Sequence, residues 1–235
     1  MSDFSPSDPR LWSTVKAYLA AKRTVIAQGY ANEIDWQDSV LFDACTEQVF
    51  LREAAWVVLS SGMRESVIRK KFPSITAAFL GWESADRIAQ TSDRCRSQAL
   101  QHFNHNGKID AILTISKHVS LFGFETVRKR IEDEGVNFIT QLPFMGPATS
   151  LHLAKNLGFP VAKPDRHLIR MAEAAGYTSP EQMCNDISDI VSDRVQVVDL
   201  VLWRYATLRE DYLEIFPAPG SWTLDNEDCG LCWLH

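Results

Sequence analysis

The residues best suited to chemistry lie in two neighbouring stretches of this 235-residue chain. Residues 141–150 read QLPFMGPATS and predict a helix, a tight hairpin and a second helix. We expect Gly146 to take the positive φ that the hairpin requires and Pro147 to open the second helix. The backbone N–H groups at that helix start have no partner within the helix, so they can bind a phosphate.

The second stretch, residues 161–168, reads VAKPDRHL and carries one acid, Asp165, at another predicted helix start. Aspartate is a preferred N-cap, and capping by itself would account for this residue. An ionised carboxylate there can also stabilise the positive charge that develops on a sugar when a glycosidic bond breaks, or orient or deprotonate a water. His167 is expected to be a buried or capping partner rather than a second catalyst.

Composition and charge indicate an ordinary globular protein, with 46% hydrophobic and 23% charged residues. The net charge of −6 argues against a protein that coats nucleic acid non-specifically, but it leaves room for a local basic face. No apolar run approaches the roughly 18 residues of a membrane span. Five cysteines without regular spacing and an N-terminus unlike a secretory signal predict a cytoplasmic protein.

Helical periodicity dominates the chain and predicts an all-α fold of about ten or eleven helices. The stretch 30–43 is expected to be irregular, a helix from Arg64 is expected to end at Pro73, and Asn106-Gly107 is expected to break the pattern. Basic runs at 64–71 and 128–130 are either solvated helix faces or phosphate contacts, and proximity to the hairpin favours contact.

The hairpin stretch resembles the helix–hairpin–helix of the HhH-GPD DNA glycosylase superfamily, whose pattern is close to L-P-G-h-G-x-[K/x]-T-A, with h apolar. Residues 163–170 are similar to the family's V-D-T-H-V-x-R segment, and Ala148 lies 17 residues before Asp165, close to the family's spacing. Residues 57–63 resemble the L-L-S-x-Q segment before the loop that wedges into the duplex, and residues 199–203 resemble the final D-x-x-L-[MW] helix. The resemblance spans about residues 46–208.

The resemblance implies a two-lobed helical fold with an active-site cleft between the lobes. One lobe is 46–158, ending in the hairpin; residues 1–45 plus 159–235 form the second, and both make one compact unit. Asp165 is the implied catalytic residue. The implied DNA contacts come from the hairpin, from a residue that fills the gap left by a flipped nucleotide, and from the segment before the acid: Phe144, Met145, Gly146, Pro147, Ala148, Thr149, Met63, Arg64 and Lys163.

Departures from the family pattern narrow the implied chemistry. Ala148 stands where bifunctional members place a lysine, so no Schiff base and no strand-cutting lyase step are expected. Phe144 replaces the first hairpin glycine, which alters the turn and weakens the case for a monovalent cation there. Gly62 stands where a wedging glutamine is common, leaving Met63 or Arg64 for that role. Cys184, Cys229 and Cys232 do not reproduce the family's iron–sulfur spacing, so neither a metal nor another cofactor is expected.

Aromatic side chains suit stacking against an extruded base as well as core packing. The pocket candidates are Trp12, Trp36, Trp203 and Tyr205, whereas Trp56 is expected in the core.

The expected activity is that of a monomeric, monofunctional DNA glycosylase acting on double-stranded DNA. Its substrate is an alkylated purine, a mismatched or oxidised base, or a hypermodified cytosine, such as a glucosylated hydroxymethylcytosine, of phage DNA in antiviral defence. The competing interpretations are a non-catalytic helix–hairpin–helix DNA-binding module and a helical scaffold for protein partners.

Overall fold

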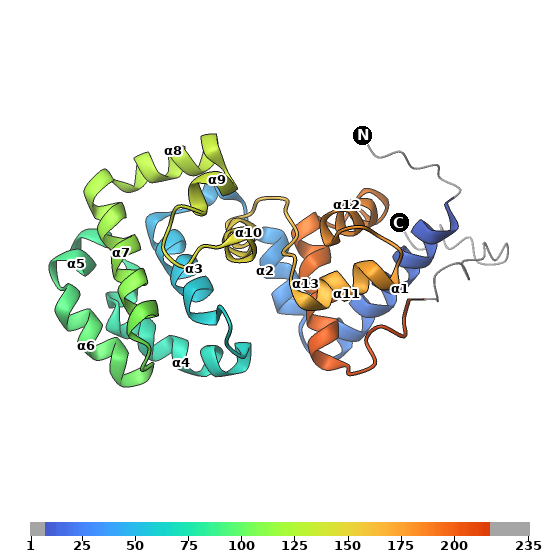
Figure 1. The fold of residues 1–235 in the computed structure, drawn as a ribbon, viewed down its shortest axis with the longest axis horizontal. Helices are drawn as coiled ribbons and strands as arrows, with labels where there is room; N and C mark the ends of the chain where they lie inside the picture. Colours follow the sequence, from blue (N-terminus) through green and yellow to red (C-terminus); the bar gives the residue numbers. More distant parts are fainter. Residues whose placement is uncertain (1–7, 217–235) are drawn as a thin grey trace. The chain divides into compact units, whose positions relative to one another are not determined.

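The computed structural model describes residues 8–216, which contain thirteen α-helices and two short 3₁₀-helices and no β-strand (Figure 1). The all-α prediction is confirmed, with more helices than expected. The chain divides into two compact units: unit 1 joins Met1–Val40 to Pro160–His235, and unit 2 is Leu41–Phe159. Unit 2 starts five residues before the expected lobe 46–158 and ends one residue after it.

Unit 1 is organised around its last helix, α13 (Val195–Leu208), which packs against each of the other four helices. Its apolar residues, among them Val198 and Leu202, are buried almost all round, and they form one core with Tyr18 and Met171. The other helices of the unit are α1 (Pro9–Ala27), α2 (Ala31–Ser39), α11 (Arg166–Ala174) and α12 (Pro180–Val191). The helix that carries Asp165 at its start is therefore held by the core of this unit.

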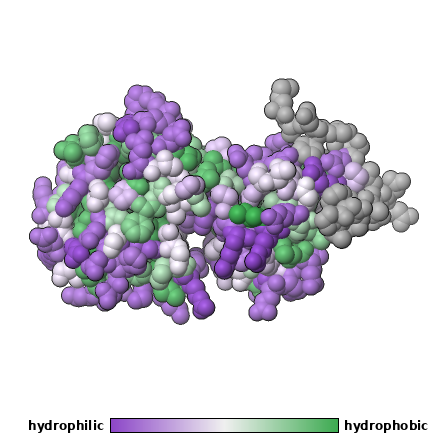
Figure 2. Space-filling model, in the orientation of Figure 1, coloured by the Kyte–Doolittle hydropathy of each residue, from purple (hydrophilic) through white to green (hydrophobic). Residues whose placement is uncertain are grey.

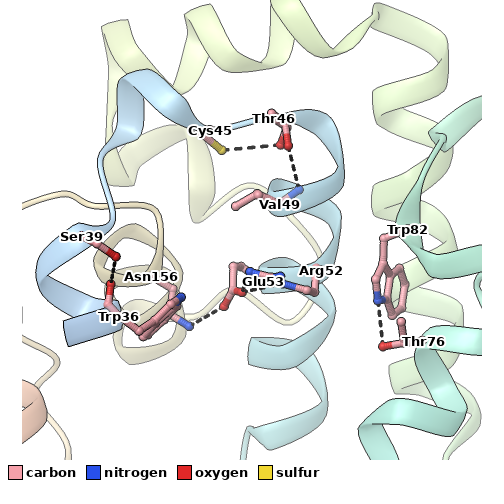
Figure 3. Close-up of polar contacts among 10 residues, drawn as sticks. All are labelled: Trp36, Ser39, Cys45, Thr46, Val49, Arg52, Glu53, Thr76, Trp82 and Asn156. Carbon is pink, nitrogen blue, oxygen red and sulfur yellow. Dashed lines mark hydrogen bonds and ion pairs between the residues drawn. The ribbon is translucent and has the colours of Figure 1, made fainter. Parts of the chain in front are cut away.

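Unit 2 is organised around α7 (Asn106–Phe122), which packs against α3, α5, α6 and α8. The core includes Trp82, whose indole stacks on Phe79 with ring centroids 4.7 Å apart and donates a 3.0 Å hydrogen bond to the Thr76 hydroxyl (Figure 3). The elements of the unit are η1 (Phe42–Ala44), α3 (Glu47–Ser60), α4 (Glu65–Ala78), η2 (Leu80–Trp82), α5 (Ala85–Gln90), α6 (Ser92–His102), α7, α8 (Phe124–Glu134), α9 (Val136–Ile139) and α10 (Pro147–Asn156).

Three local predictions were wrong. The stretch expected to be irregular forms α2, because Ile34 is buried and Glu33 pairs with Arg204 of α13 through two 2.9 Å hydrogen bonds. Helix α4 continues through Pro73, since Ile68 and Ile75 on either side of it are fully buried and their burial outweighs a lost hydrogen bond. Asn106 starts α7 instead of breaking a helix.

On the face shown in Figure 2, hydrophilic residues are interspersed with apolar ones. Among residues 8–216 no helix combines the length and apolar character needed to span a membrane.

A buried carboxyl group lies in unit 1 without a full set of partners. Asp186 on α12 is 5% exposed, and its Oδ2 has no hydrogen-bond partner within the described part of the chain. Burial raises the pKa of Asp186 to about 6, and the carboxylates of Asp189 and Asp8 add to this while Arg10 opposes it. The folded protein therefore binds a proton here at a pH where the unfolded chain has lost it.

Replacing Asp186 with Asn tests this linkage. Because the pKa is higher in the folded state, the stabilising contribution of the protonated group is complete below about pH 4 and is lost as pH rises through 6. Asp186→Asn stays neutral, so its free energy of unfolding at pH 7.5 should exceed that of the wild type by about 1 to 3 kcal/mol and match it at pH 4. Urea denaturation across this range measures the difference, with Asp35→Asn as the control, because Asp35 is exposed and is not among the groups that shift the pKa of Asp186. A less stable Asp186→Asn at pH 7.5 would contradict the assignment.

Candidate active site

The hairpin of unit 2 has a different backbone from the one expected. Gly146 has φ −73° and ψ −179°, an extended conformation open to any residue. The positive φ falls instead on Phe144, at +63°, the position where the family pattern has glycine. A side chain in this region costs about 1 kcal/mol, so the turn keeps the glycine-type backbone despite the aromatic residue.

The hairpin is closed by its own side chains. The Thr149 hydroxyl donates to the carbonyl oxygens of Phe144 (2.9 Å) and Gly146 (3.1 Å), and Met145 N–H donates to Leu142 O (3.1 Å). These carbonyl oxygens accept hydrogen bonds from the chain's own donors, which makes the hairpin a poor fit to a monovalent cation.

The start of α10 leaves backbone donors open. Ser150 N–H bonds Gly146 O at 2.9 Å, whereas the N–H groups of Ala148 and Thr149 have no partner anywhere in residues 8–216. Gly146 and Pro147 are exposed, so an anion can approach this helix end. The side chain of Met145 is buried and its N–H donates to Leu142 O within the turn, so neither of these two groups is available to DNA.

A buried carboxylate fixes the position of α10, the second helix of the hairpin. Glu53 on α3 accepts a 2.9 Å hydrogen bond from the Asn156 amide on α10 and pairs with the neighbouring Arg52 at 3.0 Å (Figure 3). Burial raises the pKa of Glu53, while Arg52 and the Asn156 hydrogen bond oppose that shift. This contact, which joins residues 103 positions apart, was not predicted.

The proposed wedge turn is the connection between α3 and α4. Gly62 takes φ +67°, and the side chains of Met63, 41% exposed, and Arg64 face solvent. The turn is held by Lys108, a buried residue of α7 whose ammonium group donates to Leu59 O at 2.7 Å and to Ser61 O. Burial lowers the pKa of Lys108 to about 8. The sequence placed Lys108 only in a helix, because nothing local marks the partner carbonyls.

Asp165 lies in unit 1 and is the N-cap of α11, as predicted. Its Oδ1 accepts both first-turn hydrogen bonds, from His167 N–H at 2.9 Å and Leu168 N–H at 3.0 Å. Its Oδ2 has no partner among the described residues, and the side chain is partly exposed. One carboxylate oxygen thus fixes the group while the other is open to a ligand.

The segment leading to Asp165 is fastened by a second acid. Asp199, buried in α13, accepts a 2.6 Å hydrogen bond from Lys163 N–H, and Lys163 O in turn accepts from Asp165 N–H at 2.8 Å. The Lys163 side chain is partly exposed. Asp199 therefore acts through the backbone on the position of Asp165.

The aromatic pocket candidates all belong to unit 1 but come from three helices. Trp12 on α1 is partly buried, and Trp36 on α2 is exposed. Trp203 packs against the core and carries the Arg204 guanidinium 4.7 Å from its ring centroid, while Tyr205 is a buried core residue. Their assembly into one base pocket stays a prediction.

The described residues hold no cluster of three or more His, Cys, Asp or Glu side chains able to bind a metal ion. Cys184 is buried, and Cys229 and Cys232 lie outside the described residues.

The comparisons with known proteins return no match: no family model, no curated protein and no solved structure matches this chain. The hairpin lies in unit 2 and Asp165 in unit 1, so each half of the candidate site rests on its own geometry.

Lys108→Met tests the anchor of the wedge turn. Removing the ammonium group leaves two carbonyl oxygens without a donor, so the free energy of unfolding should fall by about 2 to 3 kcal/mol. Chemical denaturation measures the loss. Lys117→Met is the matched control, because Lys117 is exposed on the same helix and its loss should cost less than about 0.5 kcal/mol. Equal effects from the two variants would rule out the anchoring role.

Proposed function

We propose that this chain is a monofunctional DNA glycosylase, which hydrolyses the N-glycosidic bond of a flipped-out base and leaves an abasic site. The observation that carries the proposal is that the two oxygens of the Asp165 carboxylate have different surroundings. Oδ1 is bound by two backbone N–H groups, and Oδ2 is open on a partly exposed side chain. A carboxylate held in this way is pre-oriented before a substrate arrives, which is the arrangement that electrostatic catalysis requires.

The chemistry assigned to Asp165 is stabilisation of the sugar. When the bond between C1′ and the base nitrogen breaks, its electron pair leaves with the base and positive charge develops on the deoxyribose. The Oδ2 oxygen stabilises that charge and accepts a proton from the water that adds to C1′. Ala148 carries no amine, so no covalent imine with the sugar forms at that position.

The DNA-binding role is assigned to unit 2. The open N–H groups of Ala148 and Thr149 suit a backbone phosphate, and the exposed side chains of Met63 and Arg64 suit the gap that a flipped nucleotide leaves. Backbone donors read no base identity, so this unit would position the duplex without selecting the sequence.

Three substrate classes fit this activity: alkylated purines, mismatched or oxidised bases, and hypermodified cytosines of phage DNA, where abasic sites would block replication. The missing lysine at position 148 and the missing iron–sulfur spacing mark a divergent branch and slightly favour the third class, although nothing in the sequence selects one class decisively. Incubating the protein with a panel of modified duplexes, followed by alkali, reveals abasic sites as strand breaks. Salt-dependent DNA binding without breaks on any duplex would favour the rival, a non-catalytic DNA-binding module.

Asp165→Asn separates capping from catalysis. Asparagine is as good an N-cap as aspartate, so the free energy of unfolding should change by less than about 0.5 kcal/mol. The neutral amide cannot stabilise a cationic sugar, and base release should fall at least about a thousandfold while the Kd for DNA changes less than about threefold. Single-turnover base release and fluorescence anisotropy measure the two quantities. Asp165→Ala should lose about 1 kcal/mol of stability as well. An Asp165→Asn variant that releases the base at the wild-type rate would refute the proposal.

The absence of an amine at position 148 predicts hydrolysis without strand cleavage. In the presence of borohydride, which reduces an imine to a stable cross-link, the protein should form no covalent complex with substrate DNA. Denaturing electrophoresis detects such a complex, and a bifunctional glycosylase serves as the positive control. A trapped complex would show that another amine of this chain attacks the sugar.

A further inference from the structure

Two polar atoms of unit 1, one of them two residues after Asp165 in the chain, are buried and have no hydrogen-bond partner among the residues that the structure describes. They are Nδ1 of His167 and the hydroxyl of Tyr212, which is 7% exposed. The two rings meet edge to face, with centroids 5.3 Å apart and planes at 72°. Buried polar groups in native proteins are nearly always paired, so two unpaired atoms on touching rings indicate a bound polar molecule.

Separate segments of unit 1 bring these atoms together. His167 is the second residue of α11, and its backbone N–H is one of the two bound by Asp165 Oδ1. Tyr212 lies in the turns after α13 and belongs to the buried core of the unit. The backbone around it is fixed by a 2.9 Å hydrogen bond from Glu214 N–H to Asp211 O. Both rings are therefore held before anything binds.

The hydrogen bonds of the imidazole decide which of its atoms is a donor. Nε2 accepts a long hydrogen bond, 3.4 Å, from Arg166 Nε, which assigns the hydrogen of a neutral ring to Nδ1. Burial lowers the pKa of His167, and the Asp165 carboxylate partly opposes this. That opposition also shows that the imidazole lies within electrostatic range of the carboxylate. Nδ1–H is thus a buried donor close to the proposed catalytic group.

We propose that the Nδ1–H group of His167 and the hydroxyl of Tyr212 bind one water molecule beside the Asp165 carboxylate, and that this is the water consumed in base hydrolysis. One water oxygen has the hydrogen-bonding capacity for both contacts, since it can accept from Nδ1–H and exchange a second hydrogen bond with the phenol. The inference rests on the proposed glycosylase activity.

The step balances without any further reactant. The water oxygen forms a bond to C1′ as the bond from C1′ to the base nitrogen breaks, and the bonding electron pair leaves with the base. The proton released by the water goes to Oδ2 of Asp165, and the departing base takes a proton from solvent. His167 and Tyr212 remain unchanged, because they bind the water and transfer no proton of their own.

Tyr212→Phe tests the pair by removing one oxygen atom. The single-turnover rate of base release should fall about ten- to a hundredfold, while the Kd for DNA changes less than about twofold. Thermal unfolding should occur at the same or a higher temperature, because a hydroxyl that lacks a protein partner is removed. Tyr177→Phe is the matched control, since Tyr177 is another buried tyrosine of unit 1. A rate no lower in Tyr212→Phe than in Tyr177→Phe would overturn the proposal.

Two substitutions of His167 distinguish its ring nitrogens. The amide nitrogen of Asn lies near the place of Nδ1, and that of Gln lies near the place of Nε2. His167→Asn should keep the rate of base release within about fivefold of the wild type, whereas His167→Gln should lose about tenfold or more. The opposite order would contradict binding through Nδ1.

Nuclear magnetic resonance of the DNA-free protein tests the water site independently of the proposed activity. If His167 and Tyr212 share a water, Tyr212→Phe should shift the ¹⁵Nδ1 resonance of His167, and Tyr177→Phe should leave it in place. A shift without base release by the wild type would retain the polar site and reject the glycosylase. An unmoved resonance would reject the site whatever the activity.

Discussion

The first turn of α11 sets the geometry on which the proposed chemistry depends. Its backbone N–H groups need an acceptor, and Oδ1 of Asp165 satisfies two of them at 2.9 and 3.0 Å. Because one oxygen takes both hydrogen bonds, the other has a fixed direction and no partner within residues 8–216. Capping and catalysis are therefore compatible uses of one side chain. The buried Asp199 strengthens the arrangement by holding the backbone two residues before the cap.

In unit 2, two buried charged side chains join helices that are far apart in the sequence. Glu53 ties α3 to α10, and Lys108 ties α7 to the end of α3, so both surface turns rest on charged groups inside the unit. A buried charge is costly unless it is hydrogen-bonded, and each of these has its partners. The exposed hairpin and the exposed turn can then lack regular structure without losing their position.

Local chemistry was readable from the sequence, whereas contacts between distant residues were not. The cap at Asp165 was predictable because its donors lie within three residues of the acceptor. The pairing of Glu53 with Asn156 spans 103 positions and leaves no local signal. The hairpin shows an intermediate case: its place was predicted, but the positive φ was assigned to Gly146 although the left-handed residue is Phe144, two positions earlier. Glycine is permissive, so its presence does not show which residue of a turn uses that freedom.

The conformation of Phe144 bears on how the hairpin responds to selection. Phe144 is 43% exposed, and its ring lies edge to face with that of His105, the N-cap of α7, with centroids 6.4 Å apart. The packing of this exposed ring therefore offsets little of the conformational energy of the positive φ. Glycine or asparagine would adopt the same φ at lower energy. A library screened for heat resistance would drift to those residues at position 144. A second library, screened for DNA binding, would show whether the aromatic ring is retained there, as a contact between Phe144 and DNA would require.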